Sequence, residues 1–210
     1  MIDPAGQQVV TELEALNKQM TGCAACGLAK GRTQVVPGEG NPHAEVVFIG
    51  EGPGFHEDQQ GRPFVGPAGQ FLDELLKAAG LRRSEVYICN IVKCRPPGNR
   101  DPYPIEIQTC SKWLDSQLAL VHPKVIVTLG RYSLARYLPG QSISKVHGKP
   151  LVKDGVTIVP MLHPAAALHQ ASLRPTLLED FAQLPQILKA ARAAPTPAGA
   201  AAGTQQLTLF

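Results

Sequence analysis

Short apolar runs rich in β-branched residues alternate with longer amphipathic stretches along most of the chain. The short runs end in turn-forming residues and predict strands. The longer stretches predict helices, with Gly80 and Pro123 as stop signals. Strands that alternate with helices are typical of a parallel sheet covered on both faces. The predicted strands are residues 46–49, 86–92, 125–129 and 156–162, and the predicted helices are residues 70–79, 105–121, 132–137 and 176–191.

This pattern stops near residue 191. Residues 191–205 are mostly Ala, Pro, Gly and Thr, which cannot form a packed core, so we expect a flexible linker. Residues 206–210 restore large apolar side chains at the end. We therefore expect a folded domain over residues 1–190, a linker over 191–205 and a terminal peptide over 206–210.

Composition narrows the class of protein only modestly. With 210 residues and a net charge of +3, the chain is long enough for one domain and basic enough to permit a nucleic-acid partner without requiring one. No apolar run is long enough for a membrane span, and the first residues lack the features of a secretory signal. We therefore expect a cytoplasmic protein. Basic residues in loops could contact phosphates or simply be solvated: Arg32, Arg62, Lys93, Arg95 and Arg100.

Four of the five cysteines are spaced as one close pair and two scattered thiols, and we expect them to bind a metal centre. A zinc ribbon usually draws its ligands from two short knuckles, so this spacing favours a [4Fe-4S] cluster over structural zinc. A disulfide would need an oxidising compartment. Cys89 lies inside a predicted strand and is expected to pack as a small apolar residue. The expected ligands are Cys23, Cys26, Cys94 and Cys110.

The residues that follow each predicted strand are the candidates for chemistry, because ligands of parallel sheets bind at the strands' carboxyl ends. The loop over 50–54 is rich in glycine but matches neither a Walker nor a dinucleotide motif. Phe64 could stack on a planar ligand or fasten its loop to the core. Asn90 offers an adjacent donor and acceptor that match the N3–H and O4 of uracil, or it could be a turn residue. His163 could donate to a developing anion or be purely structural.

Taken together, the segments 50–58, 61–66, 90–100 and 163–165 resemble the family 4 uracil-DNA glycosylases, an iron-sulfur type of repair enzyme. The resemblance covers roughly residues 20–185, in order. It implies a three-layer α/β/α fold with a four-stranded parallel central sheet and a [4Fe-4S] cluster on the four cysteines. It also implies hydrolysis of the bond between uracil N1 and deoxyribose C1′, which leaves an abasic site. The base must first be flipped out of the duplex, because that bond cannot be reached in a stacked helix.

The same resemblance assigns roles to individual residues. Phe64 would stack on the uracil, Asn90 would read its polar edge, and His163 would support the departing anion. Gly52 would contact the base through its backbone. Four further residues match positions that place the attacking water or belong to the polar network around it: Glu51, Glu57, Asp58 and Asn99.

Two departures bear on the mechanism. Gly52 stands where family 1 relatives carry an aspartate, so Glu51 is the candidate for activating water. A related group traps uracil covalently through a histidine in an inserted basic loop, and the segment 95–104 contains neither insertion nor histidine. This favours turnover over trapping. Leu168 could fill the gap left by a flipped base or be an ordinary packing residue.

The terminal peptide resembles short motifs that dock on bacterial sliding clamps, with Gln206, Leu207, Leu209 and Phe210 as anchors. A flexible tether ending in apolar side chains suits capture by a surface groove. The alternative is a tail that folds back on its own domain. For the whole chain, the alternative to an enzyme is a noncatalytic iron-sulfur DNA-binding module that recognises damaged bases. On family grounds we expect a monomer.

Overall fold

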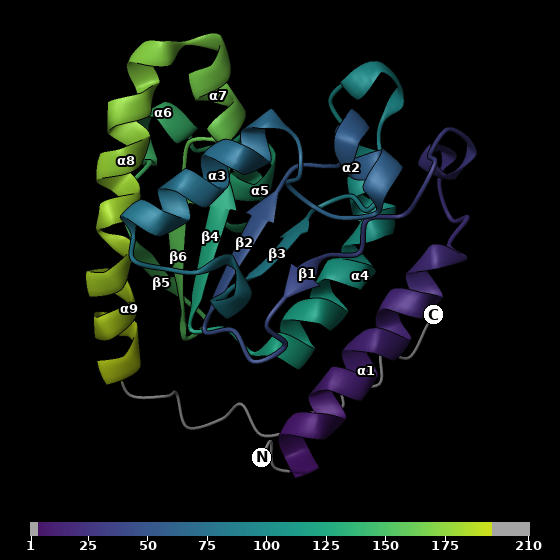
Figure 1. The fold of residues 1–210 in the computed structure, drawn as a ribbon, viewed down its shortest axis with the longest axis horizontal. Coiled ribbons are helices and arrows are strands. Elements are labelled where there is room, and N and C mark those ends of the chain that lie inside the picture. The colour runs from purple at the N-terminus through teal and green to yellow at the C-terminus, as the bar shows by residue number, and fades with distance from the viewer. Residues whose placement is uncertain (1–3, 195–210) are drawn as a thin grey trace.

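The computed structural model describes residues 4–194 and consists of one twisted sheet between two layers of helices (Figure 1). The sheet order is β1-β3-β2-β4-β6-β5. The central strands β3, β2, β4 and β6 are parallel, whereas β1 and β5 are antiparallel edges. The strands are β1 (Glu39–Gly40), β2 (Val46–Gly50), β3 (Tyr87–Asn90), β4 (Val125–Leu129), β5 (Leu151–Lys153) and β6 (Val156–Met161).

The sheet therefore differs from the purely parallel, four-stranded sheet expected above. The four predicted strands form its centre, and two short strands that were not predicted extend it on either side. An edge strand of two or three residues is too short to show an alternation of apolar and polar positions. The fold is a mixed α/β fold with a six-stranded sheet.

All four predicted helical segments are helical. The helices at residues 4–21, 55–60, 143–146 and 164–169 were not predicted, and the single helix expected over 176–191 is divided into Arg174–Ala182 and Leu184–Ala193, with Pro185 in the first turn of the second. The helices are α1 (Pro4–Thr21), α2 (Phe55–Gln60), α3 (Pro67–Ala78), α4 (Pro104–Val121), α5 (Arg131–Tyr137), α6 (Ile143–Val146), α7 (Pro164–His169), α8 (Arg174–Ala182) and α9 (Leu184–Ala193), and short 3-10 turns lie at Gly27–Lys30, Arg83–Glu85, Pro97–Asn99 and Ala171–Leu173.

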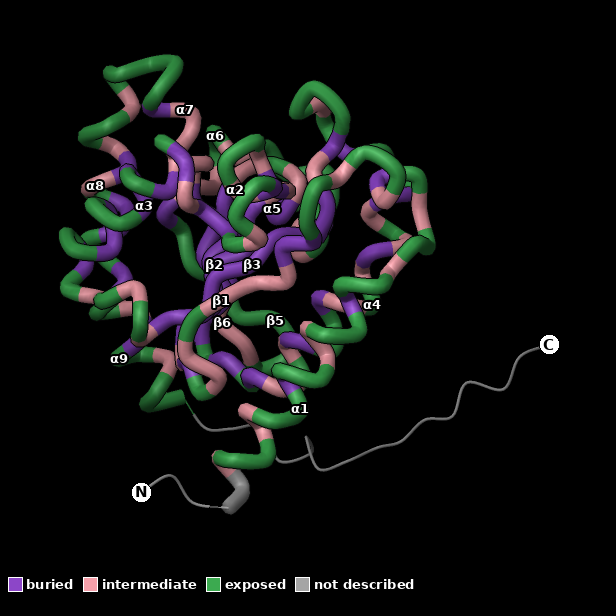
Figure 2. The backbone as a smooth tube through the Cα atoms, turned by 45° about the vertical axis from the view of Figure 1, so that its right-hand side comes forward, coloured by how far each residue is buried: buried purple, intermediate pink, exposed green. Residues whose placement is uncertain are grey.

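Alternation along β2 explains the two helical layers. Val46 and Phe48 face a core shared with α3, α8 and α9, in which Phe48 stacks on Phe181 with ring centroids 5.9 Å apart. Val47 and Ile49 face the opposite core, shared with α1 and α4. Each fully buried large apolar side chain contributes about 1.5–3 kcal/mol. The buried strands at the centre and the exposed outer helix faces are visible in Figure 2.

The carboxyl ends of the parallel strands meet at one edge of the sheet. Gly50 is in register with Asn90, and Leu129 is in register with Met161. The segments that follow β2, β3 and β6 consequently converge, with α2 and α7 near this edge (Figure 1). Within residues 4–194, no helix has the length and apolar character needed to cross a membrane.

Candidate active site

A pocket of about 460 Å³ opens at this edge of the sheet. Its walls come from the loop after β2, the loop before α3, the end of β3 with its following loop, and the start of α7. The structure brings most of the predicted site residues together here. The pocket is lined by Glu51, Gly52, Glu57, Phe64, Asn90, Asn99 and His163 from the predicted set, and by Pro53, Gly54, Ala68, Pro96, Arg100, Ala165, Ala166 and His169.

Phe64 forms an aromatic wall of the pocket. Its ring lies against the His163 imidazole, with centroids 5.6 Å apart and an interplanar angle of 27°. The residue has a φ of 51°, a left-handed conformation that costs a non-glycine residue free energy and needs support from its surroundings. Gly69 permits this arrangement, because a Cβ there would lie 1.9 Å from the Phe64 carbonyl oxygen. The backbone of Phe64 is therefore packed closely against the first turn of α3.

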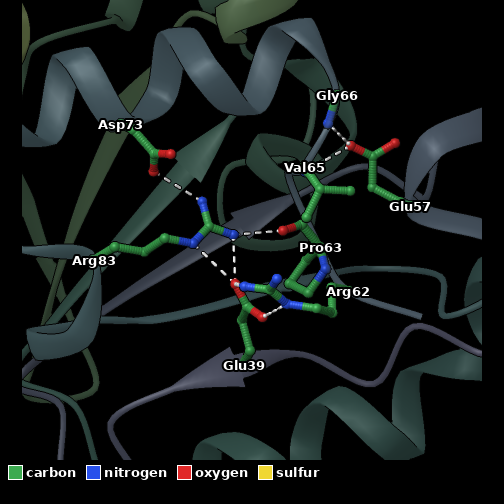
Figure 3. A network of polar contacts seen from close by, with 8 residues as sticks. All are labelled: Glu39, Glu57, Arg62, Pro63, Val65, Gly66, Asp73 and Arg83. Carbon is green, nitrogen blue, oxygen red and sulfur yellow. Dashed lines mark hydrogen bonds and ion pairs between the residues drawn. The ribbon is translucent and has the colours of Figure 1, made fainter. Parts of the chain in front are cut away.

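A polar network holds the loop that carries Phe64 (Figure 3). Arg83 donates to the carbonyl oxygen of Pro63 at 2.5 Å and forms ion pairs with Glu39 and Asp73 at 2.7 and 2.9 Å. Arg62 also pairs with Glu39, at 2.7 Å, so its charge faces a carboxylate on the protein. The network anchors the loop to β1 and α3.

Glu57 links the two loops on either side of α2. Its carboxylate accepts hydrogen bonds from the backbone N–H groups of Gly54, Val65 and Gly66 at 3.1, 2.9 and 2.8 Å. Such charge-assisted bonds to backbone donors are among the stronger ones in proteins. Asp58 is buried and accepts from the Thr33 N–H at 2.9 Å, away from the pocket lining. Both carboxylates accept hydrogen bonds from backbone N–H groups, but only Glu57 lines the pocket.

Asn90 presents an unmatched hydrogen-bond acceptor. The residue is only 2% exposed, and its Oδ1 atom is buried without a hydrogen-bond partner in the described part of the chain. Gly50, on the neighbouring strand, leaves room for this amide, since a Cβ there would lie 2.4 Å from Asn90 Oδ1 and 2.7 Å from the Phe64 ring. Buried acceptors are normally paired, so the site is chemically suited to a ligand that brings a donor.

His163 is the N-cap of α7, and its Nδ1 atom accepts the Ala165 N–H at 3.1 Å. Burial lowers the pKa of His163 to about 4, so the imidazole is neutral at pH 7. Because Nδ1 is the acceptor, the proton of the neutral ring resides on Nε2. The residue therefore offers a neutral N–H donor.

Glu51 has the opposite electrostatic character. Burial, followed by the charge of Asp101, raises the pKa of Glu51 to about 6, although Arg131 opposes the shift. A carboxyl group with a pKa near 6 is ionised at pH 7 and remains a competent base. The pocket thus combines a basic carboxylate with a neutral imidazole.

A second cavity is lined by all four predicted metal ligands, Cys23, Cys26, Cys94 and Cys110. Apolar side chains surround them, and Arg32 donates to Cys94 Sγ at 3.3 Å. Within residues 4–194, no group of three or more His, Cys, Asp or Glu side chains is arranged tightly enough to form a metal-ion site as it stands. Cys89 is fully buried in a different core. The donor set of four thiols around one cavity fits a thiolate-bound group.

Lys93 lies between the two cavities. It lines the cysteine cavity, is 1% exposed, and donates from Nζ to the Asn90 carbonyl oxygen at 2.8 Å and to Gln117 Oε1 at 2.6 Å. The expectation that Lys93 could contact DNA phosphates is therefore wrong, because its ammonium group is enclosed. The lining of the cysteine cavity includes the basic side chains of Arg32 and Lys93 and, among the described residues, no carboxylate.

The residues Gln206, Leu207, Leu209 and Phe210, predicted to bind a clamp, lie outside the described residues. So does most of the predicted linker. Helix α9 continues to Ala193, slightly beyond the predicted start of the linker at residue 191.

Comparisons with known proteins identify the family of the chain. Residues 37–186 match the model of the uracil DNA glycosylase superfamily. The chain is 46% identical to a type-4 uracil-DNA glycosylase of Sulfurisphaera tokodaii over 83% of this chain and 84% of that protein. It is 45% identical to the type-4 enzyme of Thermotoga maritima, covering 84% and 95%, and 42% identical to that of Archaeoglobus fulgidus, covering 83% and 92%. A neutral imidazole, an open amide and an aromatic wall at one sheet edge are thus found in a chain that belongs to the uracil DNA glycosylase superfamily.

Proposed function

We propose that this protein is a uracil-DNA glycosylase that hydrolyses the N-glycosidic bond of uracil in DNA and leaves an abasic site for base excision repair. Its similarity to type-4 enzymes over most of the chain supports this activity. The structural observation that carries the proposal is the unpaired, buried Oδ1 atom of Asn90. Uracil would supply the missing donor through its N3–H, and the amide N–H₂ would donate to O4. Cytosine has no N3–H and would leave this acceptor unpaired, at a cost of about 1–3 kcal/mol.

The bond to the sugar breaks with positive charge developing on deoxyribose and negative charge on the base. Phe64 would stack on the flipped uracil, and the Nε2–H of His163 would donate to an oxygen of the departing anion. Glu51 would accept a proton from the water that attacks C1′. Gly52 and Asn99 line the same pocket, where we expect Gly52 to contact the base through backbone and Asn99 to join the polar surroundings.

The four cysteines around the second cavity support a [4Fe-4S] cluster as the bound cofactor. When bound, the cluster would cross-link the segment after α1, the loop after β3 and helix α4. The role of the cluster would be to hold these three segments together, and the pocket residues would perform the hydrolysis. Arg32 and Lys93 would offset its negative charge.

We also propose that residues 206–210 dock the enzyme on a bacterial sliding clamp in the cytoplasm. The apolar character of the peptide and its separation from the folded domain by residues 191–205 support this role. Direct titration of the isolated terminal peptide with the cognate clamp tests it, and lack of binding would defeat the proposal.

The activity is tested by incubating the pure protein with a uracil-containing oligonucleotide and then treating the DNA with alkali. Strand breakage at the uracil under single-turnover conditions is the expected result. Binding without breakage would instead support the noncatalytic DNA-binding module. An oligonucleotide with cytosine in place of uracil serves as the control for base recognition.

A further inference from the structure

Two large aromatic side chains are conspicuously exposed on the protein. Phe55 is 52% exposed and Tyr103 is 55% exposed, and they are the aromatic members of the set of exposed large apolar residues in the described part of the chain. An exposed aromatic ring offers a large flat apolar area that a planar ligand can cover. Both positions lie outside the catalytic roles considered above.

Each ring has an arginine beside it. The guanidinium carbon of Arg95 lies 5.2 Å from the Phe55 ring centroid, and that of Arg100 lies 3.7 Å from the Tyr103 ring centroid. Arg95 is held by Asn99 through a 2.7 Å hydrogen bond, and Arg100 is held by an ion pair with Glu106 at 2.7 Å. Each ring is thus supported by a fixed cation on one side and remains largely open to solvent.

Both pairs adjoin the proposed uracil pocket. Phe55 directly follows Gly54, which lines the pocket, and the two arginines flank a short loop whose Pro96 and Asn99 also line it. Arg95 forms no ion pair with a carboxylate among the described residues, so its charge is available to a phosphate. Aromatic rings combined with arginines are the usual means of holding unpaired bases.

We propose that Phe55 and Tyr103, each backed by its arginine, form a stacking platform for the unpaired bases that flank uracil in single-stranded DNA. The inference rests on the proposed function and deepens it, since it names single-stranded DNA as a preferred substrate. In a duplex the flanking bases are already stacked and paired, so the platform contributes less. Stacking accepts any base, and the platform adds affinity without adding sequence preference.

The test compares wild type with Phe55→Ala and Tyr103→Ala on a single-stranded oligonucleotide containing one uracil. Fluorescence anisotropy gives Kd, and single-turnover excision gives the rate. We expect each variant to raise Kd for the single strand roughly tenfold, with a smaller effect on the duplex. Val152→Ala is the matched control, because Val152 is also exposed but lies on the edge strand β5. It is expected to leave Kd unchanged.

A second measurement separates stacking from damage to the protein. Replacing the bases that flank the uracil with abasic analogues should weaken binding to wild type and remove most of the difference between wild type and the alanine variants. Phe55→Trp should retain wild-type Kd.

The proposed platform is overturned if the alanine variants lose equal affinity with and without the flanking bases. It is also overturned if they lose equal affinity for single-stranded and duplex DNA. If wild type excises uracil but ignores the flanking bases, the platform fails and the proposed function stands. If wild type binds without excising, the anisotropy comparison still decides the platform, whereas the proposed activity fails.

Discussion

The uracil pocket and the cysteine cavity lie at neighbouring parts of the fold but differ in their openness and in the polarity of their walls. The pocket is open, and its polar groups project from loops at the carboxyl ends of the sheet. The cysteine cavity is bounded by apolar side chains, thiols, the half-buried Arg32 and the buried Lys93. The first is suited to a ligand that enters and leaves, and the second to a group that stays. Lys93 joins them through its bond to the Asn90 carbonyl oxygen.

The largest effect is expected from removing one proposed cluster ligand. Cys94→Ala should reduce iron and acid-labile sulfide to background and lower the free energy of unfolding by on the order of 5 kcal/mol or more, because cluster binding is coupled to folding. Cys89→Ala is the matched control. Cys89 is a fully buried thiol outside the cavity, so its loss should cost only about 1 kcal/mol and retain the iron. Iron loss in both variants would contradict the assignment.

In the uracil pocket, His163→Ala should lower the single-turnover excision rate about 100- to 1000-fold, because it removes a donor to the departing anion. Iron content should stay at the wild-type level, which separates this change from the cysteine variants. His43→Ala, at an exposed position, provides the control. A near-normal rate for His163→Ala would remove the residue from the mechanism.

Lys93→Met tests the link between the two sites. The change removes the buried amine and leaves Gln117 Oε1 and the Asn90 carbonyl oxygen without their donor, each loss costing about 1–3 kcal/mol. We expect lower iron content per chain and roughly tenfold weaker binding of uracil-containing DNA. Lys124→Met, at an exposed position, should change neither quantity. Normal iron content and normal binding in Lys93→Met would show that the two sites are independent.

A smaller effect, the pH dependence of excision, should follow the ionisation of Glu51. Its pKa is raised to about 6, so the carboxylate is lost as pH falls below 6, and the excision rate should fall with it. His163 titrates only near 4 and does not contribute to this step. Glu51→Gln should be slow and lack the inflection near pH 6. A retained inflection would assign the titration to another group.

The raised pKa of Glu51 also affects stability. A carboxyl group whose folded pKa exceeds its unfolded value of 4.5 is destabilising when ionised, and the penalty develops between about pH 4.5 and 6 and persists above. Glu51→Gln should therefore be more stable than wild type at pH 7 by about 1 kcal/mol, after allowance for partial exposure. Urea denaturation at pH 7 and pH 4 measures the difference, which should shrink at the lower pH.

Sequence patterns predicted the centre of the sheet because its strands are continuous apolar runs. They missed α1, whose described buried contacts are confined to a narrow stripe that includes Leu13 and Met20. The residues placed at the pocket were found by their position after strands and by family resemblance. Of the side chains that support them, Glu57 was found by the same resemblance, whereas Arg83 was not, because it reaches Pro63 from a distant segment and nothing local marks that contact. Lys93 was misjudged for a related reason: its neighbours in sequence suggest an exposed basic loop, whereas tertiary packing encloses it.

Glu57 holds two loops through one carboxylate, and Gly69 lets the backbone of Phe64 pack against α3. The loops that would contain the base are thus held by the protein's own contacts before any nucleotide binds. A receptor that is already ordered loses little conformational entropy on binding. The main free-energy cost of recognition is then that of unstacking and rotating the nucleotide in the DNA. Uracil in weakly stacked or melted stretches of DNA should therefore be excised first, because little free energy is needed there to unstack the base.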